Sequence, residues 1–243
     1  MLSVAKDKMD EVFRPYLLCS ENIGGQEKLL LEKSFKVLTL PPFGALDSAV
    51  ASHADMLLCP LGEALAAHPD YYSENRALFD ENLIKIITID ESASKKYPDD
   101  ILLNGLFLSE TLYGRTDKLS KTLVSFARET VFTRQGYARC SVCKLSESAI
   151  ITADESIADA ASKNGVDVLK ISAGHIILDG YDYGFIGGAS FTYNDTVFFF
   201  GRVEDHLDFD KIRAFTAKHS MRTVSLSDRP LYDIGGAVVY ERQ

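Results

Sequence analysis

The stretch YARCSVCKL at residues 137–145, followed by SAIIT at 148–152, predicts two short β-strands joined by a polar turn. A helix is expected over residues 154–164, and the apolar stretch VDVLKI at 166–171 predicts a third strand. The local order is therefore strand, strand, helix, strand.

The same order recurs about 47 residues later. GFIGGASFTY at 184–193 and TVFFF at 196–200 predict two strands around a turn. A helix from Asp208 to about Ser220 and a strand at 222–226 complete this second copy.

Earlier segments fit the pattern more loosely. Residues 101–113 predict a hairpin and 117–131 a helix with one apolar face. Before them, 54–59 predicts a strand, the region around 62–82 a helical stretch, and 83–89 another strand.

The two ends of the chain supply a fifth, split unit. The chain finishes on a predicted strand at 231–240, while a predicted helix at 25–34 precedes a strand at 36–40. Joining these segments leaves no lone sheet edge exposed. We expect one domain, residues 1–243, of class α/β, in which residues 1–22 pack least predictably. The alternative is an α+β protein in which this order arises by chance.

Composition excludes several classes of function. The 243 residues include 26 basic and 35 acidic side chains, a net charge of −9, which disfavours binding to nucleic acid. No apolar run approaches a membrane span, and the charged start does not resemble a signal peptide. Four cysteines are no disulfide framework, so a cytoplasmic protein is expected.

Runs of small residues recur in or beside the first strand of each unit. Glycine inside a strand marks a bend or a close backbone approach, so five such strands are expected to converge on one axis and line a central pocket. Simple β-bulges are the alternative. None of the glycine runs is a phosphate loop. The runs are 43–45, 104–105, 138–141, 187–190 and 235–237.

Polar residues near these runs are candidates to bind a small ligand. Asp182 and Asp233 each stand shortly before a glycine pair, and two carboxylates facing one pocket suit a guanidinium or an amine. Each carboxylate alone is more often a turn former. The candidate ligand-binding residues are Asp47, His53, Asp55, Asn104, Asp182, Tyr183 and Asp233.

Cysteine and histidine give weaker signals. Cys140 and Cys143 form a single CxxC, which is a poor zinc or redox motif, and on a regular strand they point to opposite faces. We expect no metal and no cofactor, with one thiol facing the pocket. His175 is more typical of a hydrogen-bonded structural histidine than of a catalytic one. His53 and Asp55 share a face if 54–59 is a strand.

The chain resembles the pentein fold of the guanidino-modifying enzymes, a five-unit α/β propeller whose split unit joins the two ends. The superfamily includes arginine deiminases, dimethylarginine dimethylaminohydrolases, amidinotransferases and the non-catalytic initiation factor 6 proteins. The resemblance is greatest to an uncharacterised bacterial branch. It rests on HADM at 53–56, GYARCSVC at 136–143, GHI at 174–176, GYDYGFIGGAS at 180–190 and DIGG at 233–236.

The departures from the enzymes concern catalysis. The enzymes carry a nucleophilic cysteine on the last core strand, and residues 231–243 contain none. The histidine of the middle unit is also missing. The resemblance therefore implies a guanidino- or amino-acid-like ligand without the standard mechanism. Two alternatives stay open: a non-catalytic interaction protein, and an amidinohydrolase or amidinotransferase whose catalytic residues are Cys140, Cys143 or His175.

Overall fold

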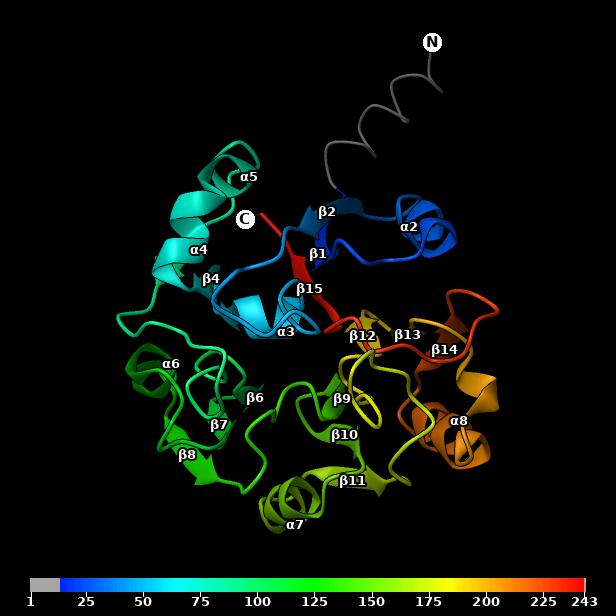
Figure 1. Cartoon of the computed structure of the whole chain (residues 1–243). Helices are drawn as coiled ribbons and strands as arrows, with labels where there is room; N and C mark the ends of the chain where they lie inside the picture. Colours follow the sequence, from blue (N-terminus) through cyan, green and yellow to red (C-terminus); the bar gives the residue numbers. More distant parts are fainter. Residues whose placement is uncertain (1–13, 243) are drawn as a thin grey trace.

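The computed structural model describes residues 14–242, and within them one three-stranded sheet is repeated five times. In every sheet the first strand is antiparallel to the second, and the second is parallel to the third. A helical segment joins the second and third strands, because parallel neighbours need a long connection. Figure 1 shows the five sheets around one axis, with these helices on the outside.

We number the repeats as units 1 to 5. Unit 1 contains β15 (Ala237–Tyr240), β1 (Tyr16–Ser20), α2 (Gly25–Leu31) and β2 (Lys36–Leu40). Unit 2 follows α3 (Ala54–Leu57) and contains β3 (Leu58–Leu61), β4 (Ala64–Ala67), α4 (Pro69–Glu74), α5 (Arg76–Asp80) and β5 (Ile86–Thr88). Unit 3 contains β6 (Leu106–Leu108), β7 (Thr111–Gly114), α6 (Lys121–Phe126) and β8 (Glu129–Phe132). Unit 4 contains β9 (Val142–Ser146), β10 (Ala149–Thr152), α7 (Glu155–Lys163) and β11 (Asp167–Lys170). Unit 5 contains β12 (Ser190–Tyr193), β13 (Thr196–Phe199), the 3-10 helix η1 (Val203–Asp205), α8 (Phe209–Lys218) and β14 (Arg222–Ser225).

Unit 1 joins the two ends of the chain, as the sequence predicts. β1 pairs in antiparallel fashion with β15, where Tyr16 faces Tyr240, and in parallel with β2, where Tyr16 faces Lys36. All five residues of β1 are buried, since this apolar strand lies in the middle of its sheet. The sequence analysis did not identify β1, which lies inside the poorly predicted residues 1–22.

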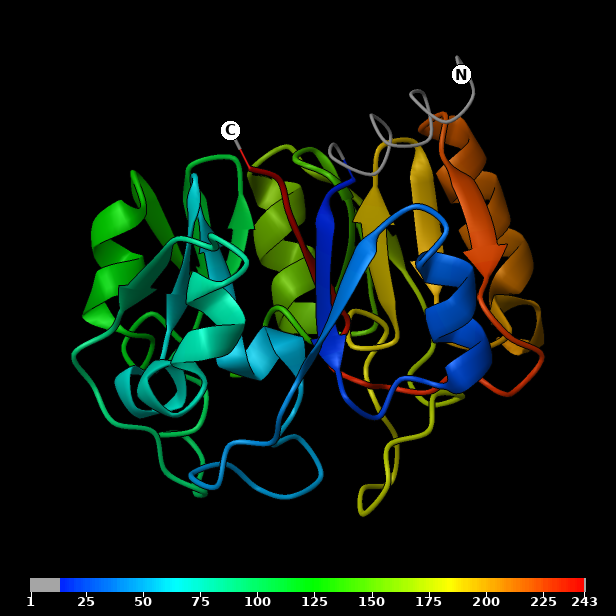
Figure 2. The same cartoon turned by 90° about the horizontal axis from the view of Figure 1, so that it is seen from above.

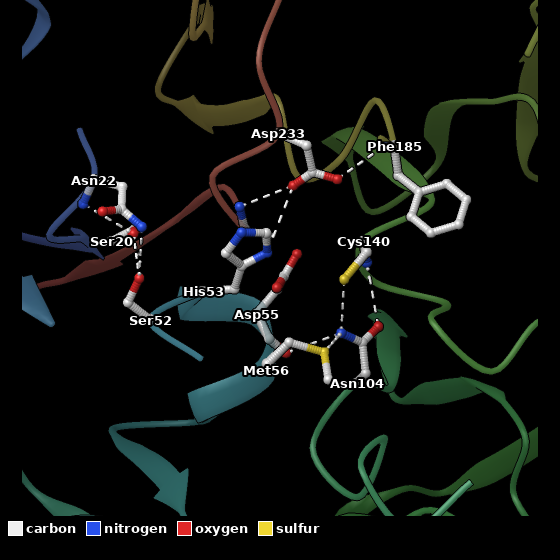
Figure 3. Close-up of polar contacts among 11 residues, drawn as sticks. Ser20, Asn22, Ser52, His53, Asp55, Met56, Asn104, Cys140, Phe185 and Asp233 are labelled. Atoms are coloured by element: carbon white, nitrogen blue, oxygen red, sulfur yellow. Dashed lines mark hydrogen bonds and ion pairs between the residues drawn. The ribbon is translucent and has the colours of Figure 1, made fainter. Parts of the chain in front are cut away.

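Hydrogen bonds close a circuit around the axis, just before the first strand of each unit. We call these first strands (β15, β3, β6, β9 and β12) the inner strands. Each preceding segment bonds to the next one around the ring, so every unit holds both of its neighbours. Figure 3 shows the part of this circuit between Asn104 and Cys140. The bonds of this axial circuit are Asp55 N to Gly235 O (3.1 Å), Gly236 N to Gly188 O (2.7 Å), Gly188 N to Cys140 O (3.0 Å), Cys140 N to Asn104 Oδ1 (3.2 Å) and Asn104 Nδ2 to Asp55 O (3.1 Å).

The circuit explains the glycine pairs that precede β12 and β15. A Cβ atom on Gly188 would overlap the Asp233 carboxylate, and one on Gly187 would overlap backbone carbonyl oxygens of unit 4. Gly236 has a φ of 60°, a conformation that favours glycine. The predicted convergence of small residues on the axis therefore holds for the runs at 104–105, 138–141, 187–190 and 235–237. It is wrong for 43–45, because unit 2 reaches the axis through Asp55 and a Cβ on Gly44 meets open space.

Several predicted elements are wrong near the axis. Residues 137–141 and 184–189 form turns, so β9 begins only at Val142 and β12 only at Ser190. Likewise β15 begins at Ala237. The axial circuit uses the backbone groups of these residues for bonds between units, and they cannot also belong to a sheet.

Three earlier predictions also need correction. Residues 54–57 form α3 rather than a strand, so His53 and Asp55 do not share a strand face. The predicted helix at 117–131 ends at Phe126 and is followed by β8, because parallel pairing with β7 takes residues 129–132 into the sheet. The predicted helical stretch around 62–82 contains β4 before its two short helices.

Apolar side chains pack between each sheet and its helix. In α7, for example, Ile157, Ala158 and Ala161 are buried on one face, and Asp154 caps the helix by accepting a bond from Ile157 N. Within residues 14–242, no helix combines the length and the apolar character that crossing a bilayer requires.

The axial circuit predicts that Gly188→Ala destabilises the protein. The new methyl group would overlap Asp233 and force the units apart, which should lower the free energy of unfolding by about 1–3 kcal/mol. The matched control is Gly44→Ala, because a Cβ there meets open space and should change stability by less than about 0.5 kcal/mol. Urea unfolding measures both; equal stability of the two variants would contradict the prediction.

Candidate functional site

Polar side chains meet on the axis at the level of the circuit. His53 and Asp55 come from the start of α3, Asn104 precedes β6, Cys140 precedes β9, and Asp233 precedes β15. Figure 3 shows these five side chains directed toward one another. Unit 5 contributes only glycine at the corresponding place, which leaves room for the others. We call these five residues the axial cluster.

Asp233 is held by backbone donors. Its Oδ1 accepts a hydrogen bond from Gly235 N at 2.9 Å, and its Oδ2 accepts one from Phe185 N at 2.8 Å. The residue is 1% exposed, and burial together with the nearby Asp55 raises the pKa of Asp233 to about 7. This carboxyl group therefore changes its charge near neutral pH.

The carboxylate of Asp55 is buried without a strong hydrogen-bond donor or a cation beside it among residues 14–242. It is 2% exposed, and neither carboxylate oxygen has a nitrogen or hydroxyl donor in the part of the chain that the structure describes; the Cys140 thiol, a weak donor, is close enough to interact with it. Figure 3 shows the carboxylate between His53 and Cys140, pointing to the centre of the cluster. A buried carboxylate is costly unless it is paired or protonated, so Asp55 is the residue of this centre that still needs a partner.

His53 and Cys140 are both uncharged in this environment. Burial lowers the pKa of His53, although Asp55 opposes the shift, and His53 Nδ1 lies 3.7 Å from Asp233 Oδ1. The pKa of the Cys140 thiol is raised well above its ordinary value by burial, and further by Asp55 and Asp233. The thiolate, which is the nucleophilic form, is therefore disfavoured when the site is empty.

Asn104 has a structural role in the cluster. Its Nδ2 also donates to Cys140 Sγ at 2.9 Å and to Met56 Sδ at 3.2 Å, and its Oδ1 accepts from the backbone N of Arg139 and Cys140. This amide ties units 2, 3 and 4 together and has little capacity left for a ligand.

The other predicted site residues lie outside the axial cluster. Asp47 is half-buried and accepts a hydrogen bond from Ala49 N, while Asp182, Tyr183 and His175 are exposed. The ring of His175 contacts His206, with 5.5 Å between centroids. Asp55, rather than Asp182, is the carboxylate that acts on Asp233.

The two cysteines of the CxxC are separated by the start of β9. Cys140 lies in the turn before the strand and Cys143 in the strand, and they pack in different apolar clusters. Burial raises the pKa of Cys143 to about 12. Within residues 14–242, no group of three or more His, Cys, Asp or Glu side chains is arranged to hold a metal ion.

A row of aromatic residues lies beside the segment that holds Asp233. Tyr137 donates a 2.6 Å hydrogen bond to Asp100, and its ring lies 6.3 Å from that of Phe185, whose backbone holds Asp233. Tyr97 and Tyr183 extend this row of rings, with centroid distances of 5.8 and 6.4 Å. Sequence reasoning missed this row, although Tyr137 and Phe185 stand three residues before axial positions of their units.

A cavity of about 380 Å3 runs along the inner strands, and Asp55 contributes to its wall. All five units line it, from residues such as Arg139 and Gly235 at the start of these strands to Glu147 and Val239 near their ends. The cavity connects the axial cluster to a space large enough for a small molecule.

Solved structures of guanidino-modifying enzymes share this fold. The dimethylarginine dimethylaminohydrolase of Pseudomonas aeruginosa, in complex with citrulline, is 9% identical, with a TM-score of 0.55 over 95% of this chain and 99% of that one. The agmatine deiminase of C. jejuni is 9% identical, with a TM-score of 0.55 over 99% and 87%. The amidinotransferase SxtG of Microseira wollei is 10% identical, with a TM-score of 0.54 over 88% of both chains.

These likenesses show the pentein fold that the sequence predicts. No curated protein matches the sequence significantly. A family model, described as "Family of unknown function (DUF6873)", matches residues 18–238. The chain therefore belongs to the family DUF6873.

Proposed function

We propose that the axial cluster binds the guanidinium or ammonium group of a small ligand between Asp55 and Asp233. The observation that carries this proposal is the Asp55 carboxylate, which is 2% exposed and has no donor stronger than the Cys140 thiol within residues 14–242. A cationic ligand would supply both the donors and the charge that Asp55 lacks.

The neighbourhood of Asp55 favours a cation over a neutral ligand. The nearby Asp55 carboxylate helps to raise the pKa of Asp233, and a cation between the two would remove that repulsion. The faces of Tyr137 and Phe185 offer further attraction for a cation that approaches the cluster. Citrulline and agmatine, which appear in the names of the structural neighbours, belong to this ligand class or to its products.

A catalytic role is the second candidate, since Cys140 lies beside His53 and two carboxylates. Burial raises the pKa of its thiol well above the ordinary value and lowers the pKa of His53, whose Nδ1 lies 3.7 Å from Asp233 Oδ1. A bound cation would lower the thiol pKa, because it would neutralise Asp55 and Asp233. Binding is therefore the primary function proposed, and turnover would depend on the ligand.

The pure scaffold alternative is less favoured. A non-catalytic ring held by its backbone would be expected to satisfy the polar groups on its axis internally, as Asn104 does. The unpartnered Asp55 departs from that expectation. We place this binding function in the cytoplasm, because all four cysteines are free thiols.

Asp55→Asn should weaken the binding of a cationic ligand. Isothermal titration of the full chain with agmatine and arginine should give binding that weakens at least about tenfold in this variant, since a charged hydrogen-bonded pair is lost. Asp182→Asn is the matched control and should bind like the wild type, because Asp182 is exposed. Equal binding by Asp55→Asn, or no binding of either compound to the wild type, would refute the proposal.

Cation binding should strengthen as pH rises from about 6 to 8. Asp233, with a pKa of about 7, must lose its proton before the ligand binds, whereas His53 stays neutral because its pKa is lowered. Titration calorimetry with agmatine at several pH values measures this trend. Asp233→Asn should remove it, and a pH-independent affinity in the wild type would contradict it.

The free energy of unfolding of the ligand-free protein should depend on pH in the opposite direction to the ligand affinity, falling as pH rises. The pKa of Asp233 is raised in the folded state, so its contribution is full below about pH 4 and is lost as pH rises to about 7. Urea unfolding between pH 4 and 8 should therefore show a decline attributable to Asp233 that is absent in Asp233→Asn.

Standard guanidino hydrolysis should remain at background. The last inner strand, β15, carries no cysteine, and the Cys140 thiol is held protonated. Citrulline formation from arginine should therefore be undetectable above a no-enzyme blank, and Cys140→Ala should not change it. Robust citrulline formation that Cys140→Ala abolishes would show that Cys140 is the nucleophile, and Cys143→Ala serves as the matched thiol control.

A further inference from the structure

The axial cavity also contains an arginine without an acidic partner. The Arg139 side chain reaches from unit 4 to unit 2, where Nη1 donates to the backbone O of Leu58, the first residue of β3. This is the single hydrogen bond of its guanidinium within residues 14–242, and four N–H donors are left over. The side chain is partly buried, and Arg139 lines the cavity wall.

Other arginines of the chain contrast with Arg139. Seven of those that the structure describes have a carboxylate within 4.0 Å, and Arg139 has none among the same residues. Their partners lie mostly on the protein surface, whereas Arg139 stands inside a cavity where water screens its charge less. The seven are Arg76, Arg115, Arg128, Arg202, Arg213, Arg222 and Arg229.

Lys144 adds a second positive charge to the same wall. Its Nζ donates to Phe107 O at 3.0 Å and to Glu147 Oε1 at 2.6 Å. Glu147 pairs with Lys144 through this oxygen and accepts a hydrogen bond from Ser109 N with the other, so Lys144 supports Arg139 rather than supplying a second unpaired charge. The guanidinium of Arg139 is also close enough to Cys59 to oppose the burial that raises the pKa of that thiol, which places the charge at the cavity wall.

We propose that Arg139, assisted by Lys144, binds a small oxyanion, a carboxylate or a phosphate, inside the axial cavity. The planar guanidinium can bind two oxygens of such a group side by side, and the enclosed wall strengthens that interaction. The site is separate from the cation site at Asp55, although both open on the same cavity of about 380 Å3.

The test is titration calorimetry of the full chain with inorganic phosphate and, separately, with acetate, at constant ionic strength set with sodium chloride. Binding of one or both is expected, and Arg139→Gln should weaken it at least tenfold, while Arg139→Lys should retain part of it. Arg128→Gln is the matched control, because that arginine is 79% exposed and paired with Glu110. Binding unchanged in Arg139→Gln, or absent for both anions in the wild type, would overturn the proposal.

A second measurement uses the wild type alone, in case Arg139→Gln fails to fold. The side-chain Nε–H resonance of Arg139 should shift with added phosphate or acetate while that of Arg128 stays in place; equal shifts of both would overturn the proposal. Asp55→Asn separates the two proposals, since it should lose agmatine binding and keep anion binding. Loss of anion binding in Asp55→Asn would show that no separate anion site exists.

Discussion

The hydrogen-bond circuit around the axis is the constraint on which the rest of this structure depends. Five units, each with its own sheet and helix, contact their neighbours through buried apolar clusters and, at the axis, through the segments before their inner strands. Each of those segments donates to one neighbour and accepts from the other, so no unit can shift without breaking two bonds. The close approach that these bonds require explains why glycine occupies the axis at units 1 and 5.

The same closeness creates the chemistry of the centre. Once backbone atoms meet on an axis, any side chain that remains there is buried and lies beside the others. Asp55 and Asp233 are therefore forced into proximity, and burial raises the pKa of Asp233 toward neutrality. Asn104 shows the other possible outcome, since its amide is consumed by bonds between units. The close approach of the units on the axis thus produces both the structural amide of Asn104 and the neighbouring buried carboxyl groups of Asp55 and Asp233.

The sequence predicts the repeating order of strands and helices well, because local periodicity and turn residues determine it. It predicts the start of the inner strands poorly: the segments before Val142 and Ser190 read as continuous strands, yet their backbone groups bond to neighbouring units. β1 was missed because five consecutive buried residues carry no alternation. Among the candidate site residues, spacing to a glycine pair favoured Asp182 and Asp233; the structure places Asp233 beside Asp55 on the axis and leaves Asp182 exposed. Local sequence cannot show which carboxylate a turn directs inward.

The split unit has a consequence for the biosynthesis of the protein. β1 is made early, yet its antiparallel partner β15 lies more than two hundred positions later, at the pairing of Tyr16 with Tyr240. Until the ribosome has released β15, one edge of β1 is open and the acceptor for Asp55 N is missing. Unit 1 therefore cannot be completed, and the ring cannot close, until β15 has been synthesised. During this period the unpaired edge of β1 can bind a chaperone or pair with a strand of a second nascent chain.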